Sequence, residues 1–179
     1  MIHPYISGIQ KSIDRNQIIQ MLKGALSDEF IAAQNYWMQG KLLLDGPFKE
    51  EIQKELFQHM AEERAHADWI IDRILHLSPG TENSPEIKPI DWDRLGKCRY
   101  TPAIEWDANS ILTNAIAGER CATDHYAQIA EFTKLRDPVT YDLVNKIIDD
   151  EFEHIRDLSK LQEMVHERHD KIQKEKGEE

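Results

Sequence analysis

The sequence predicts an all-α fold, in which residues 1–179 form a single domain built as an antiparallel four-helix bundle with a long crossover connection. Three observations predict it. Long helix-forming stretches follow one another with little sign of strands. Apolar residues recur in these stretches at steps of three and four, which keeps them on one helix face. The chain, with 40% hydrophobic and 31% charged residues, is long enough to bury a substantial core.

The breaks between the stretches set the predicted helix boundaries. Residues 45–47 (Asp-Gly-Pro) and 136–138 (Arg-Asp-Pro) are predicted tight turns, because proline suits the first turn of a helix and not its interior. Residues 77–106 hold four of the seven prolines, so we expect a long connection there, with one short helical turn near Trp92. The predicted helices span residues 14–45, 47–76, 107–135 and 138–170.

The lengths of the connections predict how the helices are arranged. A tight join makes its two helices antiparallel neighbours, so the first helix pairs with the second and the third with the fourth. The long segment between the second and third helices allows the chain to cross to the far end of the bundle.

The first and second predicted helices each carry a seam of core-facing residues. The seam of the first is Leu22, Leu26, Glu29, Ala33, Tyr36, Gly40 and Leu43. The seam of the second is Ile52, Leu56, His59, Glu63, His66 and Ile70. Both seams are mainly apolar, and both are interrupted near the middle by residues that can ionise or donate a hydrogen bond.

The third and fourth predicted helices repeat this design. The seam of the third is Leu112, Ala115, Glu119, Ala122, Tyr126 and Ile129. The seam of the fourth is Val144, Ile147, Glu151, His154, Leu158, Leu161 and Val165. Here too the polar members lie near the middle, so the polar residues of all four helices would meet at one level of the bundle.

Four carboxylates at the centre of a bundle require positive charge. Burying one unpaired carboxylate costs several kcal/mol, and Glu29, Glu63, Glu119 and Glu151 would also repel one another. No lysine or arginine occupies a central seam position. The sequence therefore predicts bound divalent cations.

The donor types indicate which cations. Four carboxylates and the imidazoles of His66 and His154 make an oxygen-rich site; carboxylate suits manganese, whereas imidazole suits iron and zinc. The absence of thiolates argues against structural zinc. Two ions bridged by shared carboxylates would use all six groups, and each Glu-x-x-His pair lies on one helix face.

An internal repeat supports two ions rather than one. A Glu, a Tyr seven residues later and a Glu-x-x-His further along occur twice, and the second Glu follows the first at an interval of 34 residues in one copy and 32 in the other. The copies are Glu29, Tyr36, Glu63 and His66, then Glu119, Tyr126, Glu151 and His154. Each copy would supply ligands to one metal ion.

Several neighbouring residues have more than one interpretation. We prefer Glu63 to Glu62 as a ligand because Glu62 lies off the seam, and we expect His59 to be a partly buried histidine one turn from the site rather than a ligand. Asp150, rather than Glu62, is the candidate to orient a ligand imidazole. Tyr36 and Tyr126 either hydrogen-bond the ligand carboxylates, supply an electron, or simply pack the core.

Composition limits the classes of partner. The net charge of -11 offers no basic face for phosphates, so DNA binding is not expected. No stretch is long and apolar enough to span a membrane, and no secretory signal is evident, so a cytoplasmic location is expected.

The chain resembles the ferritin superfamily, and bacterioferritin in particular. Residues 29–36 (Glu-Phe-Ile-Ala-Ala-Gln-Asn-Tyr), 63–67 (Glu-Arg-Ala-His-Ala) and 150–155 (Asp-Glu-Phe-Glu-His-Ile) look like its first-, second- and fourth-helix motifs. Bacterioferritin has a haem-ligating methionine directly after the second-helix Glu, whereas Arg64 stands here, so no haem is expected.

That resemblance implies a distribution of ligands between two iron ions. Glu29 and His66 would bind one iron, and Glu119 and His154 would bind the other. Glu63 and Glu151 would bridge the two.

A further resemblance is to the Dps-like proteins called thioferritins. Residues 97–100 (Lys-Cys-Arg-Tyr) and 118–122 (Gly-Glu-Arg-Cys-Ala) look like the cysteine pair of that family and its surroundings. The resemblance implies a hollow dodecameric shell that couples Fe(II) oxidation to reduction of hydrogen peroxide, or of dioxygen, and so protects against oxidative stress. It also implies a reversible disulfide between Cys98 and Cys121, although two separate buried thiols remain the alternative.

Other functions fit parts of the pattern. A non-haem di-metal peroxidase or a manganese catalase could use the same ligands, since manganese could replace iron. A non-catalytic shell that only sequesters metal is the rival from another class. A shell of 24 subunits is the alternative to one of 12.

Overall fold

Residues 8–78, 96–98 and 105–177 are described by the computed structural model of the chain. Within these ranges the chain forms four helices and no strand: α1 (Gly8–Leu42), α2 (Lys49–Leu77), α4 (Ala108–Thr133) and α5 (Pro138–Gly177). The predicted helical turn near Trp92 and most of the connection at 77–106 lie outside the described residues.

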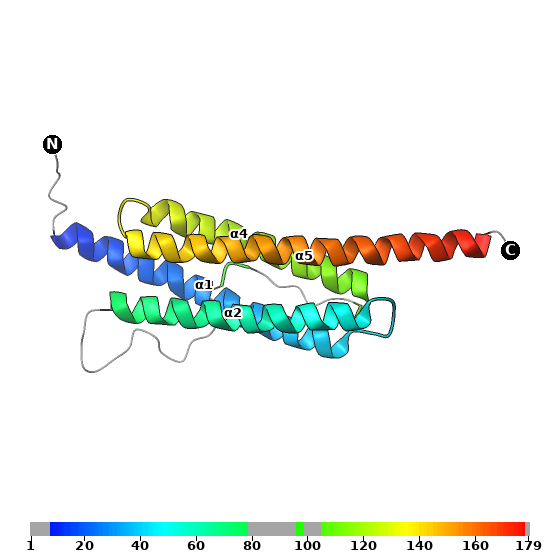
Figure 1. Cartoon of the computed structure of the whole chain (residues 1–179). Helices are drawn as coiled ribbons and strands as arrows, with labels where there is room; N and C mark the ends of the chain where they lie inside the picture. Colours follow the sequence, from blue (N-terminus) through cyan, green and yellow to red (C-terminus); the bar gives the residue numbers. More distant parts are fainter. Residues whose placement is uncertain (1–7, 79–95, 99–104, 178–179) are drawn as a thin grey trace.

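The helices pack as two antiparallel hairpins (Figure 1). α1 packs along α2, α4 packs along α5, and the hairpins meet through α1 with α4 and α2 with α5. The end of α1 lies beside the start of α4, where the backbone N–H of Leu44 donates to the carbonyl of Trp106 (2.9 Å). α2 ends at the opposite end of the bundle, so the chain must traverse its length before α4 begins. The predicted four-helix bundle with a crossover connection is confirmed.

Turn and capping residues set most helix ends. Phe48, with φ 62°, precedes the first residue of α2 and closes the turn that contains Gly46. Asp107 caps α4 by accepting a hydrogen bond from the backbone N–H of Ser110 (3.1 Å). Asp137 accepts from Thr140 in the same way at the start of α5 and also binds Arg73 of α2 (2.5 Å), which ties that end of the bundle together.

Two helix ends differ from the prediction by more than four residues, and the others agree within three. α1 begins at Gly8 rather than at residue 14, and α5 continues to Gly177 rather than stopping at 170. The seam of α5 ends at Val165, and the residues beyond it are almost all exposed. A seam marks where a helix is packed, not where it stops, so the projecting end of α5 gave no packing signal (Figure 1).

Two apolar clusters fill the bundle on either side of a polar middle. One cluster, which we call the α1-start cluster, contains Leu22, Leu26, Ile70, Ile74, Ile129, Val144 and Ile147. The other, the α1-end cluster, contains Leu43, Ile52, Leu56, Ile111, Leu112 and Leu158. Burial of each such side chain stabilises the fold by about 1.5–3 kcal/mol. The clusters therefore supply the free energy that allows charged residues to be held between them.

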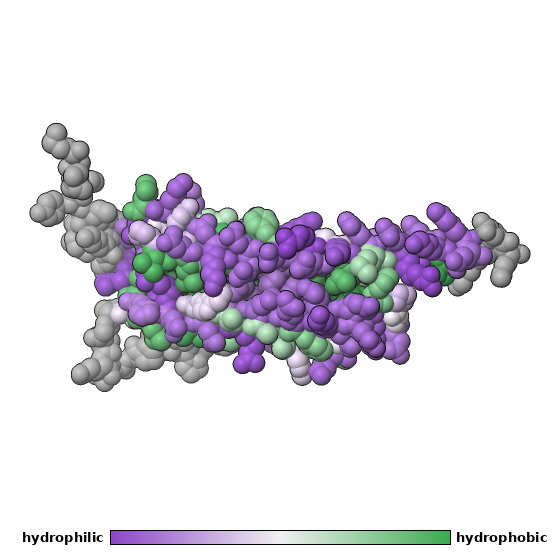
Figure 2. Space-filling model, in the orientation of Figure 1, coloured by the Kyte–Doolittle hydropathy of each residue, from purple (hydrophilic) through white to green (hydrophobic). Residues whose placement is uncertain are grey.

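The surface is mainly hydrophilic on the face seen in Figure 2, including the projecting end of α5, with scattered apolar patches. None of the helices in the described ranges is both long and apolar enough to cross a membrane.

Candidate metal centre

The six predicted ligands meet in the polar middle of the bundle. Each of the four helices contributes, and every one of the six side chains is buried: Glu29, Glu63, His66, Glu119, Glu151 and His154. Their donor atoms fall into two overlapping groups, and within each group the atoms lie within 4.8 Å of one another.

The first group surrounds His66. Its Nδ1 lies 3.4 Å from Oε2 of Glu29 and 3.2 Å from Oε2 of Glu63. Oε1 of Glu151 lies 3.5 Å from the same nitrogen. Three carboxylates and one imidazole nitrogen thus converge from α1, α2 and α5.

The second group surrounds His154 in the same manner. Its Nδ1 lies 3.4 Å from Oε1 of Glu63 and 3.3 Å from Oε2 of Glu151. Oε2 of Glu119 lies 3.8 Å from the same nitrogen. The second group therefore repeats the first, with α4 in place of α1.

Glu63 and Glu151 belong to both groups. Each turns one carboxylate oxygen toward His66 and the other toward His154. Several donor atoms of the two groups are buried without a hydrogen-bond partner: Glu29 Oε2, Glu63 Oε1, Glu119 Oε2, both oxygens of Glu151, and His154 Nδ1. Buried polar atoms normally find partners, so these inward-facing atoms fit a pair of cations that share two carboxylates.

The two non-shared carboxylates resist ionisation in the absence of metal. Burial raises the pKa of Glu29 well above its usual value, and the charge of Glu63 adds to the effect. Burial likewise raises the pKa of Glu119, and the charge of Glu151 adds to it. Two divalent cations would remove this cost by compensating the charge.

The pKa values of the shared carboxylates and of the histidines shift in the direction opposite to the effect of burial alone. Burial raises the pKa of Glu63, but the close imidazoles of His154 and His66 outweigh it and hold the pKa far below its usual value. Burial lowers the pKa of His66, but its contacts with Glu151 and Glu29 outweigh that and raise it strongly. Without metal, protons on the imidazoles therefore supply the positive charge, and cations must displace them.

Each tyrosine of the repeat holds a glutamate of the other half. The Tyr36 hydroxyl donates to Oε1 of Glu119, and the Tyr126 hydroxyl donates to Oε1 of Glu29. Burial raises the pKa of the Tyr126 hydroxyl well above its usual value, so the hydroxyl stays protonated and remains a donor. Of the three interpretations given to these residues, the structure shows hydrogen bonding to carboxylates, those of the predicted ligands Glu119 and Glu29. Electron supply by Tyr36 stays a prediction.

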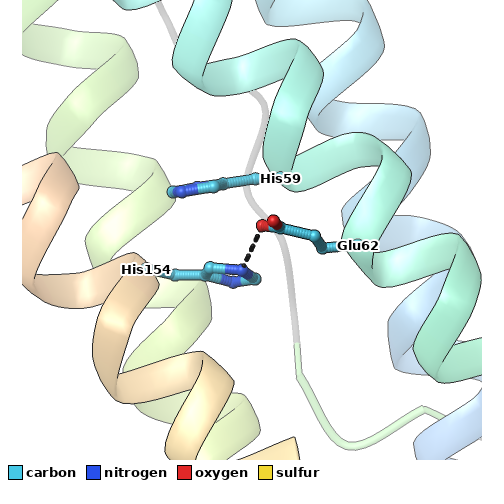
Figure 3. Close-up of side chains that lie close together, drawn as sticks. All are labelled: His59, Glu62 and His154. Atoms are coloured by element: carbon cyan, nitrogen blue, oxygen red, sulfur yellow. Dashed lines mark hydrogen bonds and ion pairs between the residues drawn. The ribbon is translucent and has the colours of Figure 1, made fainter.

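Two acids hold the far side of the imidazoles. Oδ2 of Asp150 lies 3.2 Å from Nε2 of His66, as predicted for an orienting carboxylate. Oε2 of Glu62 lies 2.9 Å from Nε2 of His154, a contact that the helix seams did not predict (Figure 3). Glu62 lies off the seam of α2, yet its side chain reaches across to α5. These contacts leave Nδ1 of each histidine facing the centre.

His59 lies beside the centre, as expected. Its ring is 1% exposed and stacks on His154, with 4.0 Å between ring centroids. Burial and the neighbouring His154 lower the pKa of His59 to about 3, so the ring is neutral.

Cys98 and Cys121 form a disulfide, with 5.6 Å between their Cα atoms. Cys121 lies on α4, two residues after Glu119. The disulfide thus joins the connection between α2 and α4 to the helix that carries a proposed ligand.

Asp28 and His125, a pair that the sequence did not predict, hold residues 96–98 in place, which we call the cysteine loop because they include Cys98. The buried carboxylate of Asp28 accepts hydrogen bonds from the backbone N–H groups of Lys97 (3.1 Å) and Cys98 (3.0 Å), and lies 2.8 Å from Nδ1 of His125. A Cβ at Gly96 would lie 2.3 Å from Asp28 Oδ1, so only glycine permits this approach. The adjacency of Asp28 to Glu29 was the only available sequence signal.

Comparisons with known proteins agree on the family. Residues 19–166 match the model described as a ferritin-like domain. A Pyrococcus furiosus protein named DNA protection during starvation protein is 31% identical over 144 residues, covering 79% of this chain and 75% of that relative. A bacterioferritin from Rhodobacter capsulatus is 28% identical over 140 residues, covering 78% of each chain.

Solved structures give the same picture. A dodecameric thioferritin from Bacteroides fragilis, described as bacterioferritin-related, superimposes with a TM-score of 0.79 at 32% identity, covering 88% of this chain and 90% of that one. Dps from Thermosynechococcus elongatus shares the fold, with a TM-score of 0.73 at 20% identity, covering 84% and 92%.

Proposed function

The chain belongs to the ferritin-like domain family, and we propose that it is a di-iron ferroxidase that oxidises Fe(II) and stores the ferric product. One observation carries the proposal. Two groups of three carboxylates and one imidazole share Glu63 and Glu151, and their unpaired donor atoms face one another inside the bundle. The proposed ligands are Glu29 and His66 for one iron, Glu119 and His154 for the other, with Glu63 and Glu151 bridging.

The proposed reaction needs two electrons and two protons. Hydrogen peroxide takes one electron from each of two Fe(II) ions, its O–O bond breaks, and two protons complete two water molecules. Dioxygen is the alternative oxidant. Glu63 and Glu151 keep the two ions close enough to act together, and the hydroxyls of Tyr36 and Tyr126 hold the non-shared glutamates in place. The iron ions are substrates, which leave as ferric product.

Storage requires an enclosed space, and we propose a hollow shell of twelve copies of this chain. The support is the Bacteroides fragilis thioferritin, which is described as dodecameric. Oxidation of iron by peroxide inside such a shell removes both reagents of hydroxyl-radical damage. We also propose that the Cys98–Cys121 disulfide is reversible.

Protection of DNA, named for the Pyrococcus relative, would here be indirect. A net charge of -11 opposes binding to phosphates, so removal of iron and peroxide is the proposed means. A gel-shift assay at several salt concentrations should show no retardation of DNA.

Stopped-flow oxidation of anaerobic Fe(II) by peroxide tests the proposal. Wild-type protein should show a fast phase that consumes one peroxide per two Fe(II) ions. Glu63→Ala should abolish that phase, and Glu153→Ala, an exposed acid on α5, should retain it. An unchanged fast phase in Glu63→Ala would refute the proposal. Rapid dismutation of peroxide by the manganese-loaded protein, without iron turnover, would instead favour a catalase.

A further inference from the structure

Three arginines gather at the end of the bundle where α1 begins, α2 ends and α4 turns into α5 (Figure 1). Arg15 comes from α1, Arg73 from α2 and Arg136 from the turn. They line a pocket of about 370 Å³, whose other lining residues are Asp14, Ile18, Leu77 and Asp137. The chain as a whole has 33 acidic and 22 basic residues, so three arginines against two acids reverse the overall balance.

Both acids of the pocket are already paired. Asp137 lies 2.5 Å from Nη2 of Arg73 and also accepts a hydrogen bond from the hydroxyl of Thr140 (2.6 Å). Oδ1 of Asp14 lies 3.8 Å from Nε of Arg136. Each acid thus balances one arginine, and the pocket retains one positive charge in excess.

That excess charge belongs to Arg15. Its Nε is shielded from water and has no hydrogen-bond partner, and none of the ion pairs between described residues includes Arg15. Buried N–H groups normally find an acceptor. The other two arginines follow this rule, since Arg73 donates to Thr140 (2.8 Å) and Arg136 donates to the carbonyl of Phe132 (2.8 Å). Arg15 therefore lacks an acceptor that the described residues do not supply.

Arg73 and Arg136 also keep donors in reserve. A guanidinium carries five N–H bonds. Arg73 uses Nε and Nη2, and Arg136 uses Nη1 and turns Nε toward Asp14. Within the described residues, no hydrogen bond occupies Nη1 of Arg73 or Nη2 of Arg136. The pocket thus combines unused donors from three elements with a net positive charge.

These donors suit a small oxyanion. The planar guanidinium matches phosphate and carboxylate through parallel N–H···O bonds, and it stays charged at every physiological pH. The apolar side chains of Ile18 and Leu77 reduce the water around the pocket and so strengthen the attraction. Ile18 also belongs to the α1-start cluster, which separates the pocket from the metal centre.

We propose that Arg15, Arg73 and Arg136 form a binding site for an inorganic oxyanion of the phosphate type. The bound anion accepts hydrogen bonds from Arg15 and from the reserve donors of the other two arginines. It thereby ties α1, α2 and the α4–α5 turn together. None of the six proposed metal ligands takes part, so the site is independent of the proposed function.

Calorimetric titration of metal-free, full-length protein with inorganic phosphate, at constant ionic strength in chloride, tests the site. Wild type should bind one phosphate per subunit. Arg15→Gln, which leaves both ion pairs of the pocket intact, should weaken binding by about 10- to 100-fold, the usual worth of a hydrogen bond to a charged group. Arg168→Gln makes the same change of charge on the exposed end of α5 and should leave the affinity unchanged.

Crystals of wild type soaked in selenate locate the anion. A selenium-edge anomalous peak within hydrogen-bond distance of Arg15 would support the site, whereas peaks only elsewhere would indicate an adventitious ion and overturn it. Equal phosphate affinity in wild type and Arg15→Gln would also overturn it. So would a wild type that binds no phosphate while Arg15→Gln changes the number of subunits, because Arg15 would then bind an acid of a second copy. If Arg15→Gln fails to fold, the wild-type selenate map decides by itself.

Discussion

The hairpins α1–α2 and α4–α5 place the same residues around the bundle centre, and each completes the other. Tyr36 of the first hairpin binds Glu119 of the second, and Tyr126 of the second binds Glu29 of the first. Each imidazole also contacts one glutamate of the other hairpin, His66 with Glu151 and His154 with Glu63. Neither hairpin can form the centre alone, because each of the two groups draws proposed ligands from both.

Two of the differences between the hairpins lie just outside the proposed ligands. Asp28, which holds the cysteine loop, corresponds to Gly118 in the second hairpin. His59 lines a groove between α2 and α5. It corresponds in the repeat to Ile147, which is buried in the α1-start cluster. The residues that both hairpins repeat thus form the centre. The residues that differ give the centre a polar side at His59 and a side at Asp28 that holds the disulfide.

Removal of either shared glutamate tests the symmetry with the largest expected effect. Glu63→Ala and Glu151→Ala should each slow peroxide-dependent Fe(II) oxidation by more than about 100-fold, since even residues that only support ligands cost about 10–100-fold when changed. Stopped-flow absorbance of ferric product measures the rate. A loss in one variant with near-normal oxidation in the other would break the equivalence of the two hairpins.

The disulfide, which is attached to α4 of the second hairpin and has no counterpart on α1, should contribute substantially to stability. Cys98 and Cys121 are 23 residues apart, so loss of the cross-link should cost about 3 kcal/mol through the entropy of the unfolded chain. Cys121→Ser should lower the midpoint of thermal unfolding by about 6–12 °C at this chain length. Scanning calorimetry with and without reductant measures it. Equal midpoints for oxidised wild type and Cys121→Ser would contradict the prediction.

Protons and metal should compete for the centre. The folded-state pKa values of His66 and His154 are raised, so the stability they provide without metal is complete below about pH 6.5 and falls as pH rises. The raised pKa values of Glu29 and Glu119 act in the same direction. Metal must displace these protons, so stabilisation by Zn(II) should grow with pH.

Thermal unfolding with and without Zn(II) at pH 5.5 and pH 8 measures that competition. At a free concentration of 100 times Kd, binding stabilises by about 2.7 kcal/mol, or about 5–10 °C. The shift at pH 8 should approach this, and the shift at pH 5.5 should be much smaller. A shift that is independent of pH would contradict proton displacement.

Replacement of either tyrosine by phenylalanine should give the smallest effect of these changes. It also separates two roles for Tyr36, carboxylate binding and electron supply. If both only hold carboxylates, Tyr36→Phe and Tyr126→Phe should each weaken metal binding by about 10-fold and slow oxidation alike. If Tyr36 also supplies an electron, its variant alone should lose the fast phase while binding two ions normally. Calorimetry and stopped-flow oxidation on the same preparations distinguish these results.

The helix seams were enough to find all six residues that meet in the centre. Steps of three and four residues place Glu63 and His66 on one face whatever the rest of the chain does, and the repeat indicates where their counterparts lie. The contact of Glu62 with His154 was not foreseeable in this way, because it depends on how far apart α2 and α5 lie. Asp28 and His125 were missed for a similar reason. Their partner is a loop remote in sequence, and a buried acid beside a ligand looks like any other polar residue.

The proposed function depends on two cations that neutralise the buried acids, and an iron-edge anomalous map of crystals soaked anaerobically in Fe(II) tests this most directly. Two peaks per subunit are expected between Glu63 and Glu151, each about 2.0–2.2 Å from Nδ1 of His66 or His154 and from carboxylate oxygens. A map without iron there, or with the four glutamates turned away from one another, would contradict it.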